Sequence, residues 1–386
     1  MNKMKKEHRA TKAVANFIRQ QYEDEGRDPI ESGRYGNDYD ENNKRTIYDE
    51  STATKGVNFG HRRLIRVMLI FFTCVWFMHR QVRLPTFSDI IASNDNNQVE
   101  AYPNQSLVII MGNLRGGEKA WGSLYKNVLD VNDADLALII GEESTNSTQP
   151  LYPNNTITKR AKYIWTFPEY NDWMDAVDLI NGSEWRQTVL PRFMKKQTDG
   201  LFGGFAGMNY GSGAIMMMMR WFLSQRLQAD PNILKQYDRF VVTRSDHYYQ
   251  CPHLFNLYDL SENNVFVPTG EDWGGLCDRH LVVSRENILA ALDLMPALLR
   301  DPSIVEKARG PRGPPNPEAI LRDSFKVHNL TVKRFDRMMY TCATERDNTR
   351  GMKAKDAIPG IPDLYLKYKG EYSLTQRTCP NEYSES

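Results

Sequence analysis

The sequence predicts an α/β domain, a mostly parallel sheet with flanking helices, preceded by a single N-terminal transmembrane helix. Two apolar runs, Ser106–Ile110 and Asp135–Ile140, enclose a segment with helical periodicity. Strand–helix–strand at this spacing is a βαβ unit, which implies parallel strands. Residues 104–350 are numerous enough for one such domain with a sizeable core. The isolated apolar segment Leu64–Met78 predicts the transmembrane helix.

The composition is that of an ordinary globular protein. The chain has 386 residues, of which 41% are hydrophobic and 25% charged, and its net charge is +1. This near-neutral balance argues against a general nucleic-acid binder, which would carry a strong basic excess. Five cysteines are too few for a disulfide scaffold.

The N-terminal part predicts a tail and an anchor. Residues 1–63 are too polar to bury a core, so we expect a disordered cytoplasmic tail. The anchor, residues 64–80, has a short apolar core, which Arg66 and Arg80 extend by snorkelling. Basic residues are denser before it than after it, which places the N-terminus in the cytoplasm and the rest in the lumen. The alternative is a buried helix of a cytosolic protein.

Two features agree with a lumenal location. All of the glycosylation sequons follow the anchor, at Asn104, Asn146, Asn154, Asn181 and Asn329. Four cysteines also follow it and permit two disulfide bridges with three connectivities: Cys251, Cys277, Cys342 and Cys379. Their wide spacing fits no zinc motif.

Periodicity predicts the remaining elements. Residues 81–103 are polar and turn-rich, as in a stem. Further strands are expected at Tyr163–Phe167, Phe240–Val242, Asn264–Pro268 and Leu281–Val283. Helices are expected at Ser183–Phe193, Ala214–Gln228 (buried, with methionines as core filler), after an N-cap at Ser284, and at Glu318–His328. Residues 351–386 read as an irregular C-terminal extension.

The loop Gly112–Gly117 follows the first strand of the domain and is a candidate phosphate site. Its glycines, Gly112, Gly116 and Gly117, let backbone N–H groups approach a phosphate, and the following helix adds a positive end. Arg115 offers a bidentate contact. The loop is neither a dinucleotide fingerprint nor a Walker loop. The alternative is a tight strand-to-helix turn.

The segment Arg244-Ser245-Asp246-His247 ends another buried strand. In open α/β sheets ligands bind beyond the carboxyl ends of strands. Asp246 and His247 are candidate ligands of Mn²⁺ or Mg²⁺ bridging a diphosphate, with Arg244 beside them. The alternative is a solvated strand end whose aspartate caps the next turn.

Two further loops are candidates for acceptor recognition. In Gly270–Gly275, the Trp273 ring suits stacking on a sugar, and Asp272 or Glu271 suits a general base that takes a proton from a hydroxyl. Asp278 lies on the acceptor side in the same region, although a structural pair with the next arginine is the alternative. No serine-hydrolase elbow and no His-Glu-x-x-His motif is present.

Taken in order, these loops resemble nucleotide-sugar glycosyltransferases of the GT-A fold, a Rossmann-like architecture. More closely, they resemble predicted glycosyltransferase-like proteins of microalgae and large algal viruses. The resemblance covers about Leu107–Arg350 and rests on VIIMGNLRGGEKAWGSLYKNVL, DADLALIIG, GSGAIMMMMRWFL, YDRFVVTRSDHYY and VPTGEDWGGLCDRHLVVSR. It implies that Arg115 and Gly116 lie near the nucleotide, that Asp246 is the metal-side carboxylate, and that Asp272 is the base. The family's Asp-x-Asp motif is Ser-Asp-His here, with one carboxylate.

The expected protein is therefore a single-pass type II transferase of the Golgi or ER membrane, with a lumenal catalytic domain. It would move a sugar from a nucleotide-diphosphate donor to a glycan or glycoconjugate hydroxyl. The alternative is a non-catalytic lumenal carbohydrate-binding or scaffold protein on the same fold. No nucleic-acid partner is expected.

The predicted topology has a direct test. If residues 104–386 are lumenal, the protein expressed in a eukaryotic secretory pathway should carry glycans at sequons such as Asn104 and Asn146. Treatment with an endoglycosidase should then increase its electrophoretic mobility. A protein with unchanged mobility would favour the cytosolic alternative, and Asn→Gln changes at the sequons are the control.

Overall fold

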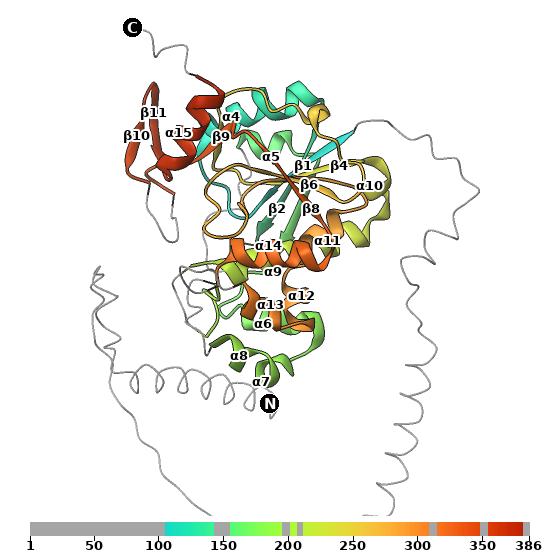
Figure 1. The fold of residues 1–386 in the computed structure, drawn as a ribbon. Helices are drawn as coiled ribbons and strands as arrows, with labels where there is room; N and C mark the ends of the chain where they lie inside the picture. The colour runs from blue at the N-terminus through green and yellow to red at the C-terminus, as the bar shows by residue number, and fades with distance from the viewer. Residues whose placement is uncertain are drawn as a thin grey trace, which may run out of the picture. The chain divides into compact units, whose positions relative to one another are not determined.

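The computed structural model describes residues 105–142, 155–194, 201–206, 211–308, 315–347 and 354–380. The predicted tail, anchor and stem, residues 1–103, lie outside these ranges. Within the ranges, no helix is both long enough and apolar enough to cross a membrane. The described residues form a mixed α/β structure (Figure 1).

A seven-stranded sheet organises the domain, in the order β3-β2-β1-β4-β7-β6-β8. Its strands are β1 (Ser106–Met111), β2 (Asp135–Gly141), β3 (Tyr163–Phe167), β4 (Arg239–Thr243), β6 (Asn264–Pro268), β7 (Leu281–Ser284) and β8 (Thr331–Phe335). Every neighbouring pair is parallel except those of β7, which runs antiparallel to β4 and β6. The mostly parallel sheet is thus confirmed. The connection 269–280 contains no helix, so the chain turns back instead of crossing over.

Helices cover both faces of this sheet. One face packs on α6 (Met174–Asn181), α7 (Trp185–Thr188), α8 (Leu190–Met194), α9 (Gly213–Ala229), α10 (Pro231–Gln236), α11 (Ile288–Leu292), α12 (Met295–Arg300), α13 (Ser303–Lys307) and α14 (Pro317–Val327). The other packs on α4 (Gly117–Leu124), its π-helical and 3₁₀ continuations η1 (Tyr125–Leu129) and η2 (Asp130–Asn132), and α5 (Thr156–Arg160). Figure 1 shows α4 above the sheet and α9 and α14 below it. Alternate residues of β1 enter the two cores, Leu107 and Ile109 in one and Val108 and Ile110 in the other.

Two helix predictions need correction and one is confirmed. The methionine-rich helix α9 is buried as expected, with Met217 and Met218 in the core. The single helix expected at Ser183–Phe193 is two short helices, α7 and α8. Ser284 is the last residue of β7 and caps no helix, because α11 begins at Ile288 with Asn287 at its N-cap position.

The expectation of an irregular extension after residue 350 is wrong. The described part of this region forms the helix α15 (Lys369–Thr378) and adds two strands to a second, four-stranded sheet in the order β10-β11-β9-β5. The strands are β5 (His247–Tyr249), β9 (Met339–Ala343), β10 (Asp356–Ile358) and β11 (Ile361–Leu366). Two of the three residues of β10 are exposed, and β11 also exposes part of its length, so the sequence carries little apolar pattern there.

Helix α15 is fixed to the domain by one buried carboxylate. Glu371 is fully buried and accepts hydrogen bonds from Arg337 Nη1 (3.0 Å) and Thr341 N (2.6 Å), while Arg279 Nε lies 3.3 Å away. Arg337 is also fully buried and donates to the carbonyls of residues 269 and 270, at 2.9 and 2.8 Å. These contacts join α15 to β9 and to the β6–β7 connection.

A disulfide gives a second attachment. Cys251, just after β5, is bonded to Cys379 at the end of α15. Cys277 and Cys342 are free and buried. The four cysteines of the domain thus form one bridge rather than the two that their number permits.

Glu371→Gln should lower the free energy of unfolding by about 3–5 kcal/mol, because two buried arginines lose their shared counter-charge. Urea unfolding of the full-length protein in a mild detergent would measure this change. The matched control is Asp130→Asn, which breaks an exposed pair with Arg160 and should cost less than about 1 kcal/mol. Similar losses in both variants would contradict the central role of Glu371.

Candidate functional site

The topological switch point of the sheet lies between β1 and β4. From β1 the chain moves outward to β2 and β3, and it then returns to β4 on the other side of β1. The carboxyl ends of β1 and β4 lie at the same edge, since these strands are parallel neighbours. Open α/β sheets bind ligands in the crevice outside such a point. The loops after β1 and β4 are therefore the first place to look for a site.

These two loops contact each other directly. The backbone N–H of Arg115 donates to Ser245 Oγ (2.8 Å), and Ser245 Oγ donates to the carbonyl of Asn113 (3.2 Å). Gly116 has φ +83°, and a Cβ there would lie 3.1 Å from Asp246 Cα. A glycine is thus required where the loops meet.

The three glycines predicted to approach a phosphate have different surroundings. Gly116 N donates to Asp347 Oδ2 (3.0 Å), so a carboxylate of the chain occupies this N–H. A Cβ at Gly112 would contact Met219 of α9, and one at Gly117 would contact Thr344. Arg115 is therefore the residue of this loop that reaches the crevice, whereas Gly116 allows the loops after β1 and β4 to pack closely.

Asp246 is an ionised carboxylate buried beneath two arginines. Its side chain is 1% exposed, and it accepts from Arg244 Nε (2.7 Å) and Nη2 (2.6 Å), with Arg115 Nε at 3.6 Å. Burial alone would raise the pKa of Asp246, but Arg244 and then Arg115 hold this pKa well below its ordinary value. The arginine side chains are 23% and 25% exposed. Asp246 thus orients two guanidinium groups that reach the surface.

Asp246 and His247 are not brought together as metal ligands. His247 Nδ1 lies 3.1 Å from Thr243 Oγ1, and the imidazole is buried against Tyr249 and His280. In the described ranges, no three or more His, Cys, Asp or Glu side chains converge as a metal site would require. As placed, these residues do not fit Mn²⁺ or Mg²⁺, because two guanidinium groups already neutralise the single carboxylate.

The C-terminal segment completes a cation cluster, which we define as Arg115, Arg244, Arg279 and Lys367. The Lys367 side chain is 7% exposed, and Arg279 Cζ lies 4.6 Å from the centre of the Tyr368 ring. Burial, then repulsion from Arg244 and the other arginines, lowers the pKa of Lys367 to about 8. No ion pair joins Lys367 to a carboxylate of the described residues. The cluster therefore holds positive charge that the chain itself does not balance.

The acidic loop 270–275 braces this cluster. Asp272 Oδ1 accepts from Arg334 Nη1 (2.8 Å) and from the N–H of Cys277 (2.9 Å). Glu271 Oε1 packs close to Gly370: a Cβ atom at this glycine would lie 2.3 Å from that oxygen. The carboxylate of Asp272 is thus held by β8 and by the loop itself, and the side chain of Glu271 packs close to the start of α15.

Trp273 is the predicted acceptor-side residue that the structure leaves accessible. Its side chain is 54% exposed. Trp273 and Glu271 both have positive φ, +45° and +54°. Such backbone strain in non-glycine residues costs free energy and clusters at functional loops.

A carboxyl group that the sequence did not indicate lies beside this loop. Glu318, in the first turn of α14, accepts the N–H of Leu276 at its carbonyl (3.0 Å), so the loop rests on the helix start. Burial first, and then the charge of Asp278, raise the pKa of Glu318 to about 8. Arg279 also acts on Glu318, and so connects this carboxyl pair to the cation cluster.

Three histidines lie beneath the site. His247, His253 and His280 are buried, and Thr243 Oγ1 lies within 3.1 Å and 2.9 Å of the Nδ1 atoms of His247 and His280. Burial lowers the pKa of His247 and of His253 to about 3 and that of His280 well below its ordinary value. All three are neutral in the folded protein.

These histidines should make the fold sensitive to acid. Their pKa is near 6.5 when unfolded, so the unfolded chain binds more protons between about pH 6.5 and pH 3. Stability is complete above this window, and within the window it should fall by about 1.4 kcal/mol per pH unit for each histidine as the pH decreases. Urea unfolding at several pH values would give the slope, which His253→Asn should reduce by about one third. An unchanged slope would exclude the histidines as its source.

Comparison with known proteins assigns the chain to no family. No protein-family model matches the chain, and no curated protein is detectably similar to it. The cation cluster and the Asp278–Glu318 pair are therefore the observations on which a function can be based.

Proposed function

We propose that this domain is a GT-A-like glycosyltransferase that moves a sugar from a nucleotide-diphosphate donor to a glycan or glycoconjugate hydroxyl. The cation cluster at the switch point is the observation that carries the proposal. Guanidinium groups donate strong, charge-assisted hydrogen bonds to phosphoryl oxygens, and Arg115 and Arg244 are partly exposed. The mostly parallel sheet with helices on both faces is compatible with the Rossmann-like architecture expected of such enzymes.

In this proposal the cluster, rather than Mn²⁺ or Mg²⁺, balances the charge of the leaving diphosphate. Fixed donors aimed at developing charge stabilise a transition state without reorganisation. Asp246 is then a positioning residue, since it holds Arg244 and Arg115. Lys367, which forms no ion pair with a carboxylate of the described residues, is the residue whose charge the diphosphate would balance.

The acceptor would enter beside Trp273. A bond forms from the acceptor oxygen to the anomeric carbon while the bond from that carbon to the donor phosphate oxygen breaks, and the electron pair leaves with the diphosphate. The hydroxyl proton passes to the carboxylate of Glu318, with Asp278 beside it. A base with a pKa near the operating pH suits this role better than Asp272, whose carboxylate is held by Arg334.

A lumenal location is part of this proposal. We place the domain in the lumen of the Golgi or ER, behind the anchor predicted at residues 64–80. The sequon residues Asn181 and Asn329 are exposed, and the Cys251–Cys379 disulfide suits an oxidising compartment.

Donor binding can be tested by thermal shift on the full-length protein in detergent, with UDP, GDP and pyrophosphate, each with Mn²⁺ or with EDTA. We expect a nucleoside diphosphate to stabilise the protein even in EDTA. Lys367→Gln should raise its Kd about 10- to 100-fold, because a charged hydrogen bond is lost. The control Lys369→Gln removes an exposed lysine of the same segment and should have no effect. No stabilisation by any diphosphate would overturn the donor site, and stabilisation only with Mn²⁺ would overturn the metal-free cluster.

Turnover needs a second measurement, release of the nucleoside diphosphate from a panel of nucleotide sugars with glycan acceptors. Glu318→Gln should lower kcat/KM by about 100-fold or more while nucleotide affinity stays unchanged, and the rate should rise as pH passes about 8. Nucleotide binding without release from any donor would favour the non-catalytic alternative.

A further inference from the structure

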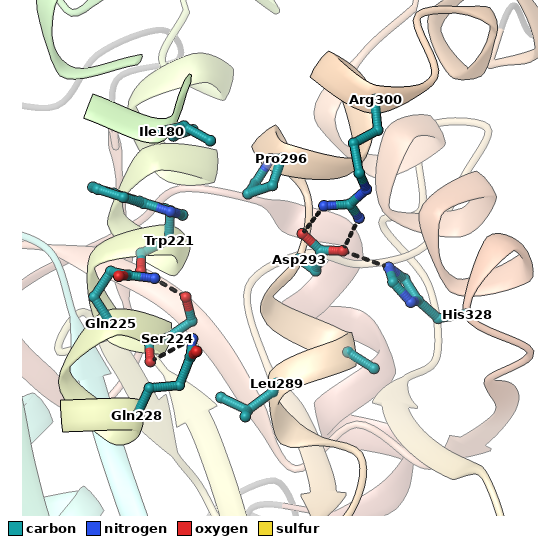
Figure 2. Close-up of a pocket in the computed structure, with 11 residues that line it drawn as sticks. Ile180, Trp221, Ser224, Gln225, Gln228, Leu289, Asp293, Pro296, Arg300 and His328 are labelled. Carbon is teal, nitrogen blue, oxygen red and sulfur yellow. Dashed lines mark hydrogen bonds and ion pairs between the residues drawn. The ribbon is translucent and has the colours of Figure 1, made fainter. Parts of the chain in front are cut away.

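A groove of about 400 Å³ lies on the helical face of the domain, away from the cation cluster. Its walls come from α9 and from α11–α12, and His328 closes one side (Figure 2). The start of α9, at Gly213, packs against Pro317 near the candidate site, whereas its end leads through α10 to the amino end of β4. The groove adjoins the second half of α9 and shares no residue with the site described above.

One wall is aromatic and carries free polar groups. Trp221 is half-buried, and Gln225 and Gln228 follow it at helical spacing on the same face of α9 (Figure 2). Neither the indole N–H of Trp221 nor the exposed amide of Gln225 has a hydrogen-bond partner in the described part of the chain. The wall thus offers a flat apolar ring beside unused donors and an unused acceptor.

The opposite wall is a fixed polar array. Asp293 accepts from Arg300, with Arg300 Nη1 at 3.4 Å from Oδ1, and His328 Nε2 lies 2.9 Å from Asp293 Oδ2 (Figure 2). Arg300 lines the groove and is exposed, so the N–H groups that Asp293 does not use are open to a ligand. Leu289 and Pro296 add an apolar surface between the walls.

From this pairing of walls we infer that the groove is an accessory binding site for a neutral saccharide of one or two sugar units. A sugar ring has an apolar C–H face that matches the Trp221 indole and hydroxyls at its edge that match Gln225 and Arg300. The volume lies at the small end of ligand sites, about 300–1,000 Å³. An anion is disfavoured because Asp293 already balances Arg300. This inference does not depend on the proposed transferase activity.

The test uses saturation-transfer NMR and titration calorimetry on the full-length protein in detergent, with methyl glycosides of common hexoses and pentoses and their disaccharides. At least one saccharide should bind with millimolar affinity. Gln225→Ala should weaken it about tenfold and Trp221→Ala should abolish it, while Trp221→Phe should retain part of it because the ring stays. The matched control is Arg226→Ala, the next residue on α9, which contacts the carbonyl of Thr166 outside the groove.

Thermal melting of each variant checks that it is folded, and Gln225 is exposed enough for its loss to be tolerated. Binding that Trp221→Ala and Gln225→Ala both weaken, and Arg226→Ala does not, supports the site. The inference is overturned if no saccharide of the panel binds, or if the two groove variants bind as the unmodified protein does. Methyl glycosides of uronates complete the panel, and binding only of these charged sugars would also overturn the inference.

Discussion

The ionic contacts of Glu371 determine whether the candidate site exists at all. Two arginines, Arg279 and Arg337, share this carboxylate in a buried setting, and Arg337 also holds the carbonyls of the β6–β7 connection. Buried ions are expensive to desolvate, so such an arrangement adds little net stability, but removal of one partner leaves the others uncompensated. The effect is to fix where α15 lies, and hence where Lys367 and Tyr368 lie.

The carboxyl groups of the site differ in charge because their surroundings differ. Asp246 and Glu371 are buried but lie against arginines, which hold their pKa values below the ordinary range. Glu318 is also desolvated, and this burial raises its pKa first, with the charge of Asp278 raising it further. Opposite shifts of this kind separate groups that organise charge from groups that exchange protons.

The sequence predicted the local parts of this structure well. The expected strand at Tyr163–Phe167 is β3, and the first βαβ unit is where its apolar runs indicate. Arg115 and Arg244 both lie beside Asp246, since each follows one of two neighbouring parallel strands. Local pattern is sufficient in these cases because burial on both faces makes a strand continuously apolar.

What the sequence did not indicate depends on contacts between distant segments. The direction of β7 depends on the shape of the β6–β7 connection. Helix α15 is polar, so its buried side chains do not stand out from their solvated neighbours in the sequence. Glu318 is an ordinary helix-start glutamate until the loop at Gly275 packs over it. Hydrophobic periodicity in the sequence does not depend on such packing, so Lys367, Tyr368 and Glu318 could be identified only from the three-dimensional structure.

The order of synthesis has a consequence for how this domain matures. Lys367, Tyr368 and Cys379 are added after every strand of the seven-stranded sheet, and the disulfide joins cysteines 128 residues apart. A nascent chain can therefore assemble the sheet and hold Arg115 and Arg244 at its edge before the cluster is complete. A chain that ended after β8 would contain every strand of the seven-stranded sheet but would lack Lys367 and Tyr368, the last residues to join the cation-rich edge.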